Sequence, residues 1–169
     1  MTLPTTHVAR VMIIDSANHV LLCRYSETID DLVVGYWVPP GGALEAGEDH
    51  REAACREARE ETGLVVQPGS QLFERRFILH MQDGPVDQVE RYFLARLSAV
   101  RPEVANSTGE DIQELRWRSI DDLRSTTERI YPEGPVEQLS SVMAGTHISE
   151  LCDGAAWQGA EFGDMASDH

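Results

Sequence analysis

The segment from residue 39 to residue 63 constrains the fold more than any other part of this 169-residue chain. Its first four residues, Pro-Pro-Gly-Gly at 39–42, exclude a helix and the interior of a sheet, because proline fixes φ and lacks a backbone donor. Residues 48–62 are strong helix formers without proline or glycine, and Gly63 stands where a left-handed cap is preferred. We therefore expect a shaped loop that leads into a helix.

Apolar, β-branched runs on both sides of this segment predict the strands of a sheet. The predicted strands are 7–15, 19–25, 71–81, 88–97 and 112–118, the last with Leu115 and Trp117 on one face. Turn signals at 16–18 and at Gly84-Pro85 join the first four strands into two hairpins. Residues 26–38 lead from the first hairpin into the loop without a predicted element.

Two further helices are predicted toward the C-terminus. Ser119 and Asp122 resemble a capping box that starts a short helix, and 135–145 has proline near its start, glycine at its end and one apolar face. Residues 146–169 are acidic and lack a clear period. We expect one domain over 1–145, a mobile acidic tail over 146–169, and a layered α/β class from the mixture of strands and helices.

The charge balance limits the partners of the chain. The net charge is −15 and all 14 basic residues are arginine, so long-range attraction to duplex nucleic acid or to an anionic membrane is missing. No segment approaches the roughly 18 apolar residues of a membrane span. Cys23, Cys55 and Cys152 have no paired spacing, which favours a reducing compartment. We expect a cytoplasmic protein, and its oligomeric state is open, with a homodimer as one alternative.

The predicted helix gathers negative charge on one face. Glu57, Glu60 and Glu61 are spaced i, i+3 and i+4, so their side chains lie within about one turn, where like charges repel by a few tenths of a kcal/mol. A hard divalent cation with oxygen ligands would compensate for this repulsion. The alternative is an acidic face exposed to solvent, as in many glutamate-rich helices.

The loop and the helix together form a recognisable pattern. The residues Gly42-x5-Glu48-x7-Arg56-Glu57-Ala58-Arg59-Glu60-Glu61-Thr62-Gly63-Leu64 resemble the complete box of the Nudix hydrolase family, with Ala58 smaller than the usual aliphatic residue. The resemblance extends over about 7–145. It implies the Nudix α/β/α sandwich, a mixed β-sheet between helices with a loop-helix-loop metal site.

The resemblance also implies roles for the residues of the box. Glu57 and Glu61 would be the principal ligands of Mg²⁺ or Mn²⁺, and the main-chain carbonyl of Gly41 an additional ligand. Glu60 would be a further ligand or the base that deprotonates water, and Arg56 would orient the carboxylates through charge-assisted hydrogen bonds.

Support and proton transfer involve further residues. Glu48 would support the junction of loop and helix, and Gly42 permits the close approach of the loop. The general base is Glu60 by first choice. The alternatives are Glu90 on a predicted strand and three acidic residues near the last strand, Glu110, Asp111 and Glu114.

The implied function is attack by a metal-activated water on one phosphorus of a nucleotide-like diphosphate. The substrate is open among nucleotide sugars, dinucleoside polyphosphates and modified nucleoside triphosphates, while the acidic balance and the absence of lysine disfavour RNA decapping. Trp37 and Tyr131 are candidate substrate contacts, with Tyr36 and Phe77 as further aromatics able to stack on a base. His50 and His80 are expected to be structural or exposed.

Two alternatives come from other functional classes. An isoprenoid-diphosphate isomerase of the same fold would use a catalytic cysteine, and Cys23 lacks the strand motif expected around it. A ligand-sensing Nudix-like domain without catalysis tends to lose box carboxylates, which are all present here.

Overall fold

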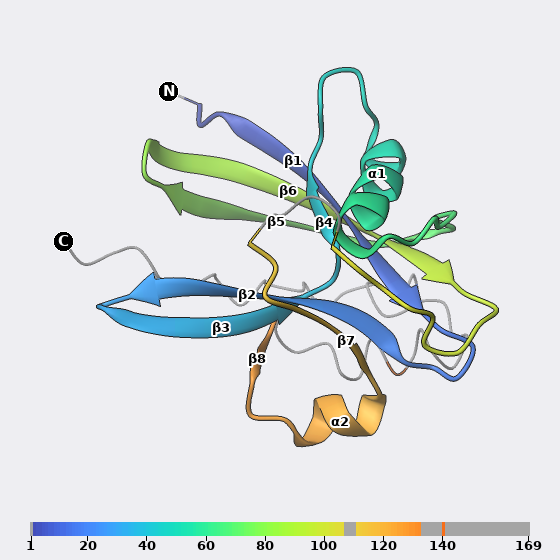
Figure 1. The fold of residues 1–169 in the computed structure, drawn as a ribbon. Coiled ribbons are helices and arrows are strands. Elements are labelled where there is room, and N and C mark those ends of the chain that lie inside the picture. The colour runs from blue at the N-terminus through green and yellow to red at the C-terminus, as the bar shows by residue number, and fades with distance from the viewer. Residues whose placement is uncertain (1, 107–110, 133–139, 141–169) are drawn as a thin grey trace.

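The computed structural model describes residues 2–106, 111–132 and 140, which form one mixed sheet with two helices (Figure 1). The strands are β1 (Thr5–Ile14), β2 (Val20–Ile29), β3 (Leu32–Val38), β4 (Gly41–Ala43), β5 (Gln71–Met81), β6 (Gly84–Arg96), β7 (Glu114–Arg118) and β8 (Arg129–Ile130). The helices are α1 (His50–Thr62) and α2 (Ile120–Ser125). No helix in these ranges is long and apolar enough to cross a membrane.

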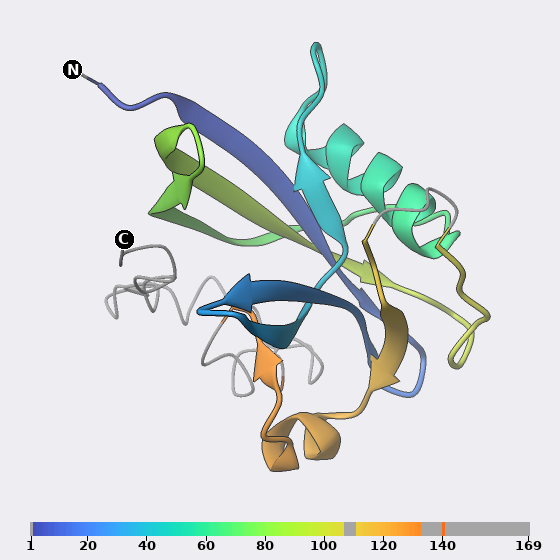
Figure 2. The same cartoon turned by 60° about the vertical axis from the view of Figure 1, so that its left-hand side comes forward.

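The sheet forks at β1. The strands follow the order β5-β6-β1-β2-β3-β8, with β1 parallel to β6 and antiparallel to β2. β1 and β2 are registered at Ile14 and Val20, whereas β4 pairs with β1 at Val8, Ala9 and Arg10. Figures 1 and 2 show the β2–β3 hairpin separated from β1, β5 and β6 at one end. At the end of β1 where β4 pairs, the β2–β3 hairpin is therefore not paired with β1.

The two faces of the sheet are covered by different helices (Figure 2). Along β1, Val11 and Ile13 belong to the apolar cluster that includes Ala54 and Ala58 of α1. The alternate residues Met12 and Ile14 join the opposite cluster, which contains Leu123 of α2. This period of two is what a strand buried on both faces requires. The predicted α/β sandwich with a mixed sheet between helices is confirmed.

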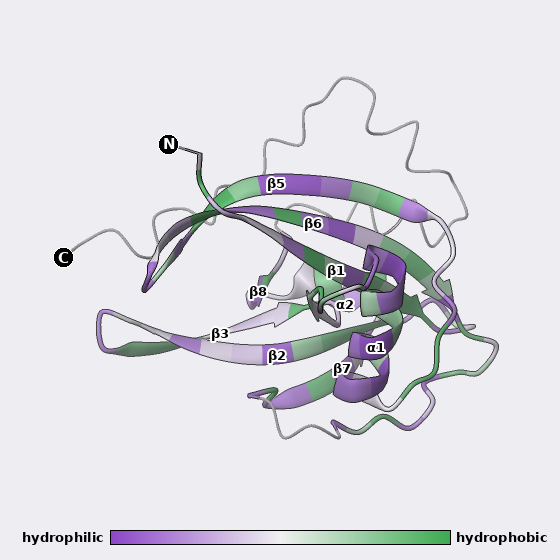
Figure 3. Ribbon diagram, turned by 90° about the horizontal axis from the view of Figure 1, so that it is seen from above, coloured by the Kyte–Doolittle hydropathy of each residue, from purple (hydrophilic) through white to green (hydrophobic). Residues whose placement is uncertain are grey.

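Local sequence explains how α1 begins and ends. Asp49 caps the first turn by accepting a hydrogen bond from the Glu52 N–H, and the Glu52 side chain bonds back to the Asp49 N–H. Gly63 ends the helix at φ 76°, as predicted for a left-handed cap. In Figure 3 α1 is mostly hydrophilic, and small alanines rather than large apolar residues bring it against the sheet.

Several predicted bounds differ from the structure. Residues 39–42 are not wholly a loop, because Gly41–Ala43 forms β4 on the edge that β1 leaves open. β2 runs on to Ile29 and pairs with β3, a strand that was not predicted. Gly84-Pro85 lies at the start of β6 instead of in a connecting loop. The predicted short helix is α2, with Ser119 accepting from the Asp122 N–H. The predicted helix 135–145 and tail 146–169 lie outside the described residues, apart from residue 140.

Candidate metal and diphosphate site

Glycine lets the loop approach both the sheet and α1. A Cβ atom on Gly41 would lie 2.3 Å from the carbonyl oxygen of Ala9, and one on Gly42 would lie 2.5 Å from Oε1 of Glu57. Both distances are shorter than real Cβ contacts, and the neighbours are backbone or a buried carboxylate. The two glycines therefore allow β4 to lie against β1 while the Glu57 carboxylate reaches the loop.

The three predicted carboxylates differ in their exposure. Glu57 is 7% exposed and Glu61 is 1% exposed, while the side chain of Glu60 is 38% exposed. Positions 57 and 61 are one turn apart on the edge of α1 that faces β4, and Glu60 lies toward solvent. The predicted carboxylate face is present, but its exposure differs from residue to residue: Glu61 is buried and Glu60 is partly exposed.

Glu61 is held by two donors from different strands. The Tyr25 hydroxyl donates to Glu61 Oε1 at 2.7 Å, and the Gly41 N–H donates to Oε2 at 2.8 Å. Burial is the largest influence on this carboxyl, and the negative charge of Glu57 adds to it, so the pKa of Glu61 is raised to about 7. The two hydrogen bonds and the charge of Arg10 oppose the increase in pKa. The charge of Arg10 and the two donors therefore compensate only part of the cost of ionising the buried Glu61 carboxylate.

Arg56 links the loop to the carboxylates of α1. Its guanidinium donates to Glu48 at 2.6 and 3.0 Å, to Glu57 at 2.8 Å, to Glu60 at 3.2 Å and to the Ala43 carbonyl at 3.0 Å. Glu48 also accepts from the Glu45 N–H at 2.9 Å. These contacts match the orienting and supporting positions predicted for Arg56 and Glu48.

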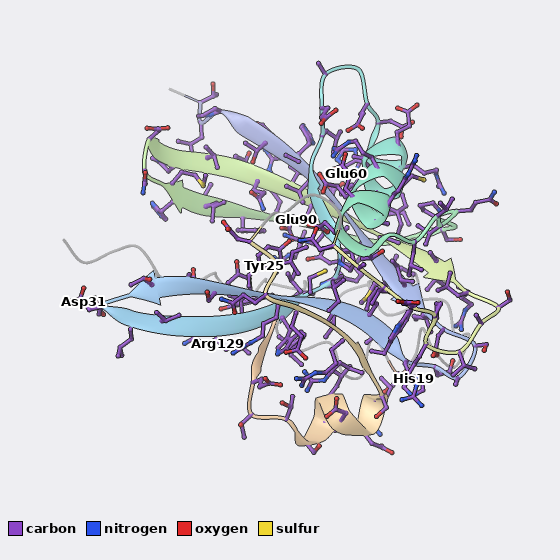
Figure 4. The ribbon with its side chains drawn as sticks, viewed as in Figure 1. His19, Tyr25, Asp31, Glu60, Glu90 and Arg129 are labelled. Carbon is purple, nitrogen blue, oxygen red and sulfur yellow. The ribbon has the colours of Figure 1, made fainter. Side chains whose placement is uncertain are left out.

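These side chains line one pocket of about 570 Å³, which we call the carboxylate pocket. Its lining consists of Arg10, Tyr25, Tyr36 and Val38 from the sheet, residues 41–45 from β4 and the loop after it, and Arg56, Glu57, Glu60 and Glu61 from α1. Figure 4 shows Glu60 and Tyr25 between α1 and the β2–β3 hairpin. The fork in the sheet thus places all three predicted carboxylates at one pocket.

The donor chemistry of the carboxylate pocket fits a hard divalent cation. Oxygen atoms of Glu57, Glu60 and Glu61 are the ligand type that Mg²⁺ and Mn²⁺ prefer. Within the described ranges, however, no three acidic, histidine or cysteine side chains are already grouped closely enough to hold a metal ion. Glu57 and Glu60 are turned toward Arg56, and Glu61 toward Tyr25 and Gly41. Binding a cation therefore requires a change of side-chain partners.

The two predicted aromatic contacts, Trp37 and Tyr131, lie in different surroundings. Trp37 is 1% exposed and packs in the α2-side core, with the guanidinium groups of Arg116 and Arg118 within 5.3 Å of its ring centroid. This placement leaves its ring no face for a nucleobase, which does not fit the expected role. Tyr131 is 5% exposed and contacts the pocket indirectly, through an edge-to-face contact with Tyr36.

The remaining candidates lie away from the pocket lining. Phe77 lies under the Arg75 guanidinium at 4.7 Å. His50 packs edge-to-face against His7 at 5.2 Å, and His80 is exposed on β5. These placements agree with the structural or exposed positions expected for the two histidines.

The alternative bases also differ in accessibility. Glu90 is 1% exposed and accepts hydrogen bonds from Arg75 at 2.8 Å and Tyr92 at 2.7 Å. Burial opposes its ionisation, but the charges of Arg10 and Arg75 outweigh it and lower the pKa of Glu90 to about 2. Such a carboxylate is a poor proton acceptor near neutral pH. Asp111 is exposed, Glu114 accepts from Arg116 at 2.8 Å, and Glu110 lies outside the described residues.

Sequence reasoning did not single out two residues of the carboxylate pocket, Arg10 and Tyr25. The available signal for Arg10 was a cation inside the apolar run of 7–15, since a charged residue on a strand buried on both faces needs a partner. Tyr25 gave no local signal, because its contact with Glu61 joins residues 36 positions apart.

Comparison with known proteins agrees with the fold and the box. The family model described as the NUDIX domain matches residues 4–138, and the chain therefore belongs to the Nudix family. The structure resembles that of a MutT protein from Methanosarcina mazei, with a TM-score of 0.62, 22% identity, and coverage of 84% of this chain and 97% of that one. At this identity, the similarity to the MutT protein supports the fold.

Sequence relatives include two curated proteins at 31% identity. One is the uncharacterized Nudix hydrolase YvcI of Bacillus subtilis, matched over 97 residues that cover 54% of this chain and 56% of the relative. The other is the asymmetrical bis(5'-nucleosyl)-tetraphosphatase of Mus musculus, matched over 94 residues that cover 53% and 59%. The chain thus spans little more than half the length of these relatives.

Proposed function

We propose that this protein is a metal-dependent hydrolase that cleaves the diphosphate linkage of a nucleoside diphosphate joined to another group. The observation that carries the proposal is the buried pair Glu57 and Glu61, whose carboxylates line one pocket with Glu60. When bound, Mg²⁺ or Mn²⁺ would supply the charge that neutralises the diphosphate and would lower the pKa of the attacking water.

The side chains divide the work by exposure and partner. Glu57 and Glu61, with the Gly41 carbonyl, would hold the ion in the carboxylate pocket. Glu60, the most exposed of the three carboxylates, takes the proton as water adds to one phosphorus and the bridging P–O bond breaks. Arg56 orients Glu57 and Glu60 through its hydrogen bonds to them, and Glu48 fixes the Arg56 guanidinium in turn.

The two alternative functions have less support. Cys23 is buried, and burial raises the pKa of its thiol well above the usual value, so it is unsuited to act as the reactive cysteine of an isomerase. A sensing domain without catalysis has no need of a complete set of box carboxylates. Product analysis separates these functions. A hydrolase releases phosphate-bearing fragments, whereas an isomerase preserves the diphosphate and a sensor leaves its ligand unchanged.

Among substrates, we favour dinucleoside polyphosphates for the first assays, because one relative carries that activity in its name. Nucleotide sugars and modified nucleoside triphosphates complete the panel. The acidic charge balance supports a small-molecule substrate in the cytoplasm without duplex nucleic acid. A homodimer stays a proposal to be tested by light scattering.

The decisive experiment measures product release from this panel with Mg²⁺, with Mn²⁺ and with a chelator. We expect Glu57→Gln and Glu61→Gln to reduce turnover by at least about 100-fold, as loss of a main charge-stabilising group does, while circular dichroism shows an intact fold. Arg76→Gln, an exposed residue paired with Asp87, is the control. Full activity in both glutamate variants, or in chelator, would refute the proposal.

A further inference from the structure

Arg10 stands out as a cation of the carboxylate pocket whose hydrogen bonds run to Pro39 and Glu90, while its charge also acts on Glu61 of α1. The other basic residue of the lining, Arg56, donates to Glu48, Glu57 and Glu60. Arg10 comes from β1, at the position registered with Gly41 of β4, and its side chain is 18% exposed. The pocket therefore has one cation bound to its acidic edge and a second one on the sheet side.

Two contacts fix the guanidinium of Arg10 to the sheet and to the loop before β4. Nη1 donates to the Pro39 carbonyl at 3.1 Å, and Nε lies 3.5 Å from Oε1 of Glu90. Neither of these two contacts engages Nη2. A guanidinium fixed at two nitrogens and accessible at the third suits an oxyanion ligand.

Glu90 does not neutralise Arg10. It accepts from Arg75 at 2.8 Å, from Gln88 at 2.9 Å and from Tyr92 at 2.7 Å, and its contact with Arg10 is the longest of the four. Glu90 is shared between Arg10 and Arg75, and Glu61 is the other carboxylate whose charge acts on Arg10. Arg75 is buried, with 4% of its side chain exposed, so Arg10 is the guanidinium of this group that lines the pocket.

From this arrangement we propose that Arg10 binds a phosphate oxygen of the substrate, on the side of the pocket opposite the cation held by α1. The inference rests on the proposed function, and it assigns the diphosphate two anchors: a divalent cation on the acidic edge and a guanidinium on the sheet. A substrate that presents a phosphate to both anchors is fixed in direction across the pocket.

The test separates binding of the anion from binding of the metal. The probe is α,β-methylene-ADP, a diphosphate that resists cleavage, titrated by calorimetry in the presence of Mg²⁺, and Mn²⁺ alone is titrated by electron paramagnetic resonance. For Arg10→Gln we expect the Kd of the probe to rise on the order of 10- to 100-fold, the range for loss of one charge-assisted hydrogen bond, with no comparable loss of Mn²⁺ affinity. Arg10→Lys should lie between, since it keeps the charge and loses the fork.

Arg76→Gln removes a guanidinium of the same kind on β5 and serves as the matched control, with an unchanged Kd expected. Should Arg10→Gln fold poorly, the Kd of the probe is compared between the wild type and Arg10→Lys, provided that the two proteins have the same melting temperature. An unchanged Kd for the probe in the folded Arg10 variant overturns the inference, as does an equal loss of Mn²⁺ affinity.

Failure of the inference differs from failure of the proposed function. If the wild-type protein hydrolyses a diphosphate and Arg10→Gln leaves its KM unchanged, the inference fails and the hydrolase function stands. If the probe binds in an Arg10-dependent manner while no member of the panel is cleaved, the site for the anion stands and the hydrolase function fails.

Discussion

Two carboxylates of the molecule, Glu61 and Glu90, are buried to the same extent and behave in opposite ways. Each is 1% exposed. Burial raises the pKa of Glu61 to about 7, because its two neutral donors and the charge of Arg10 do not offset burial and the nearby charge of Glu57. At Glu90 the same burial is outweighed by Arg10 and Arg75, and the pKa falls to about 2. The sign of the shift depends on which charges the fold brings to the carboxylate.

The difference separates a structural carboxylate from one suited to bind a ligand. Glu90 has its cations and hydrogen-bond donors within the fold, so nothing further is needed to keep it ionised. Glu61 has donors and a nearby like charge, so an added cation would lower its free energy. In an acidic protein, counting glutamates does not distinguish these cases, whereas their partners do.

The largest expected effect is on stability at neutral pH. Glu90→Gln should lower the free energy of unfolding by about 3 to 5 kcal/mol, because the buried Arg75 and the partly buried Arg10 lose their shared anion. Glu61→Gln should be neutral or stabilising, since it removes a carboxylate that burial disfavours. Urea unfolding at pH 7 in chelator measures both. Equal losses in the two variants would contradict the contrast drawn between these carboxylates.

The second effect is a pH dependence of opposite sign at the two residues. The folded protein holds a proton on Glu61 up to pH about 7, while the unfolded chain releases it near the ordinary glutamate pKa. Without metal, Glu61 should therefore reduce stability as pH rises from about 4.5 to about 7, by on the order of 3 kcal/mol. The stability contributed by Glu90 is instead lost as pH falls from about 4.5 toward about 2.

Melting curves across pH in chelator test this contrast, with Glu61→Gln as the reference that lacks the titrating group. The variant should lose less stability than the wild type between pH 5 and 7. Parallel curves would show that Glu61 titrates normally.

The smallest effect concerns one hydroxyl. Tyr25→Phe removes the donor to Glu61 Oε1, worth about 1 kcal/mol to the ionised form. The pKa of Glu61 should rise further, and the midpoint of the pH dependence of Mn²⁺ binding should move upward. Tyr36→Phe, at the ring stacked on Tyr25 at 5.8 Å, is the control. A shift of equal size in both variants would assign the effect to the aromatic pair instead of the hydroxyl.

The sequence predicted elements whose causes are local. Gly63 marks the end of α1, because a left-handed cap depends on a single residue. The predicted strand 71–81 matches the bounds of β5, because its alternation is continuous. The i, i+3, i+4 spacing predicted a shared carboxylate face, and the structure places Glu57, Glu60 and Glu61 in one pocket.

Features that depend on distant partners could not be predicted in this way. Gly41–Ala43 is a strand because β1 leaves an edge open beside it, which no local propensity records. Trp37 is a residue type that often contacts ligands, yet the alternation of β3 places its side chain in the apolar cluster that contains Leu123 of α2. The opposite pKa shifts of Glu61 and Glu90 arise from partners at positions 10, 25, 41 and 75.

The two hydrogen bonds to Glu61 join three chain segments at a single side chain: β2 through Tyr25, β4 through Gly41, and α1. None of these segments can leave its place without dismantling the pocket. Loss of the proposed hydrolase activity in denaturant should consequently coincide with the global transition, and a partly unfolded form that keeps this activity should not accumulate. Catalysis would then report directly on cooperative folding of the whole sandwich.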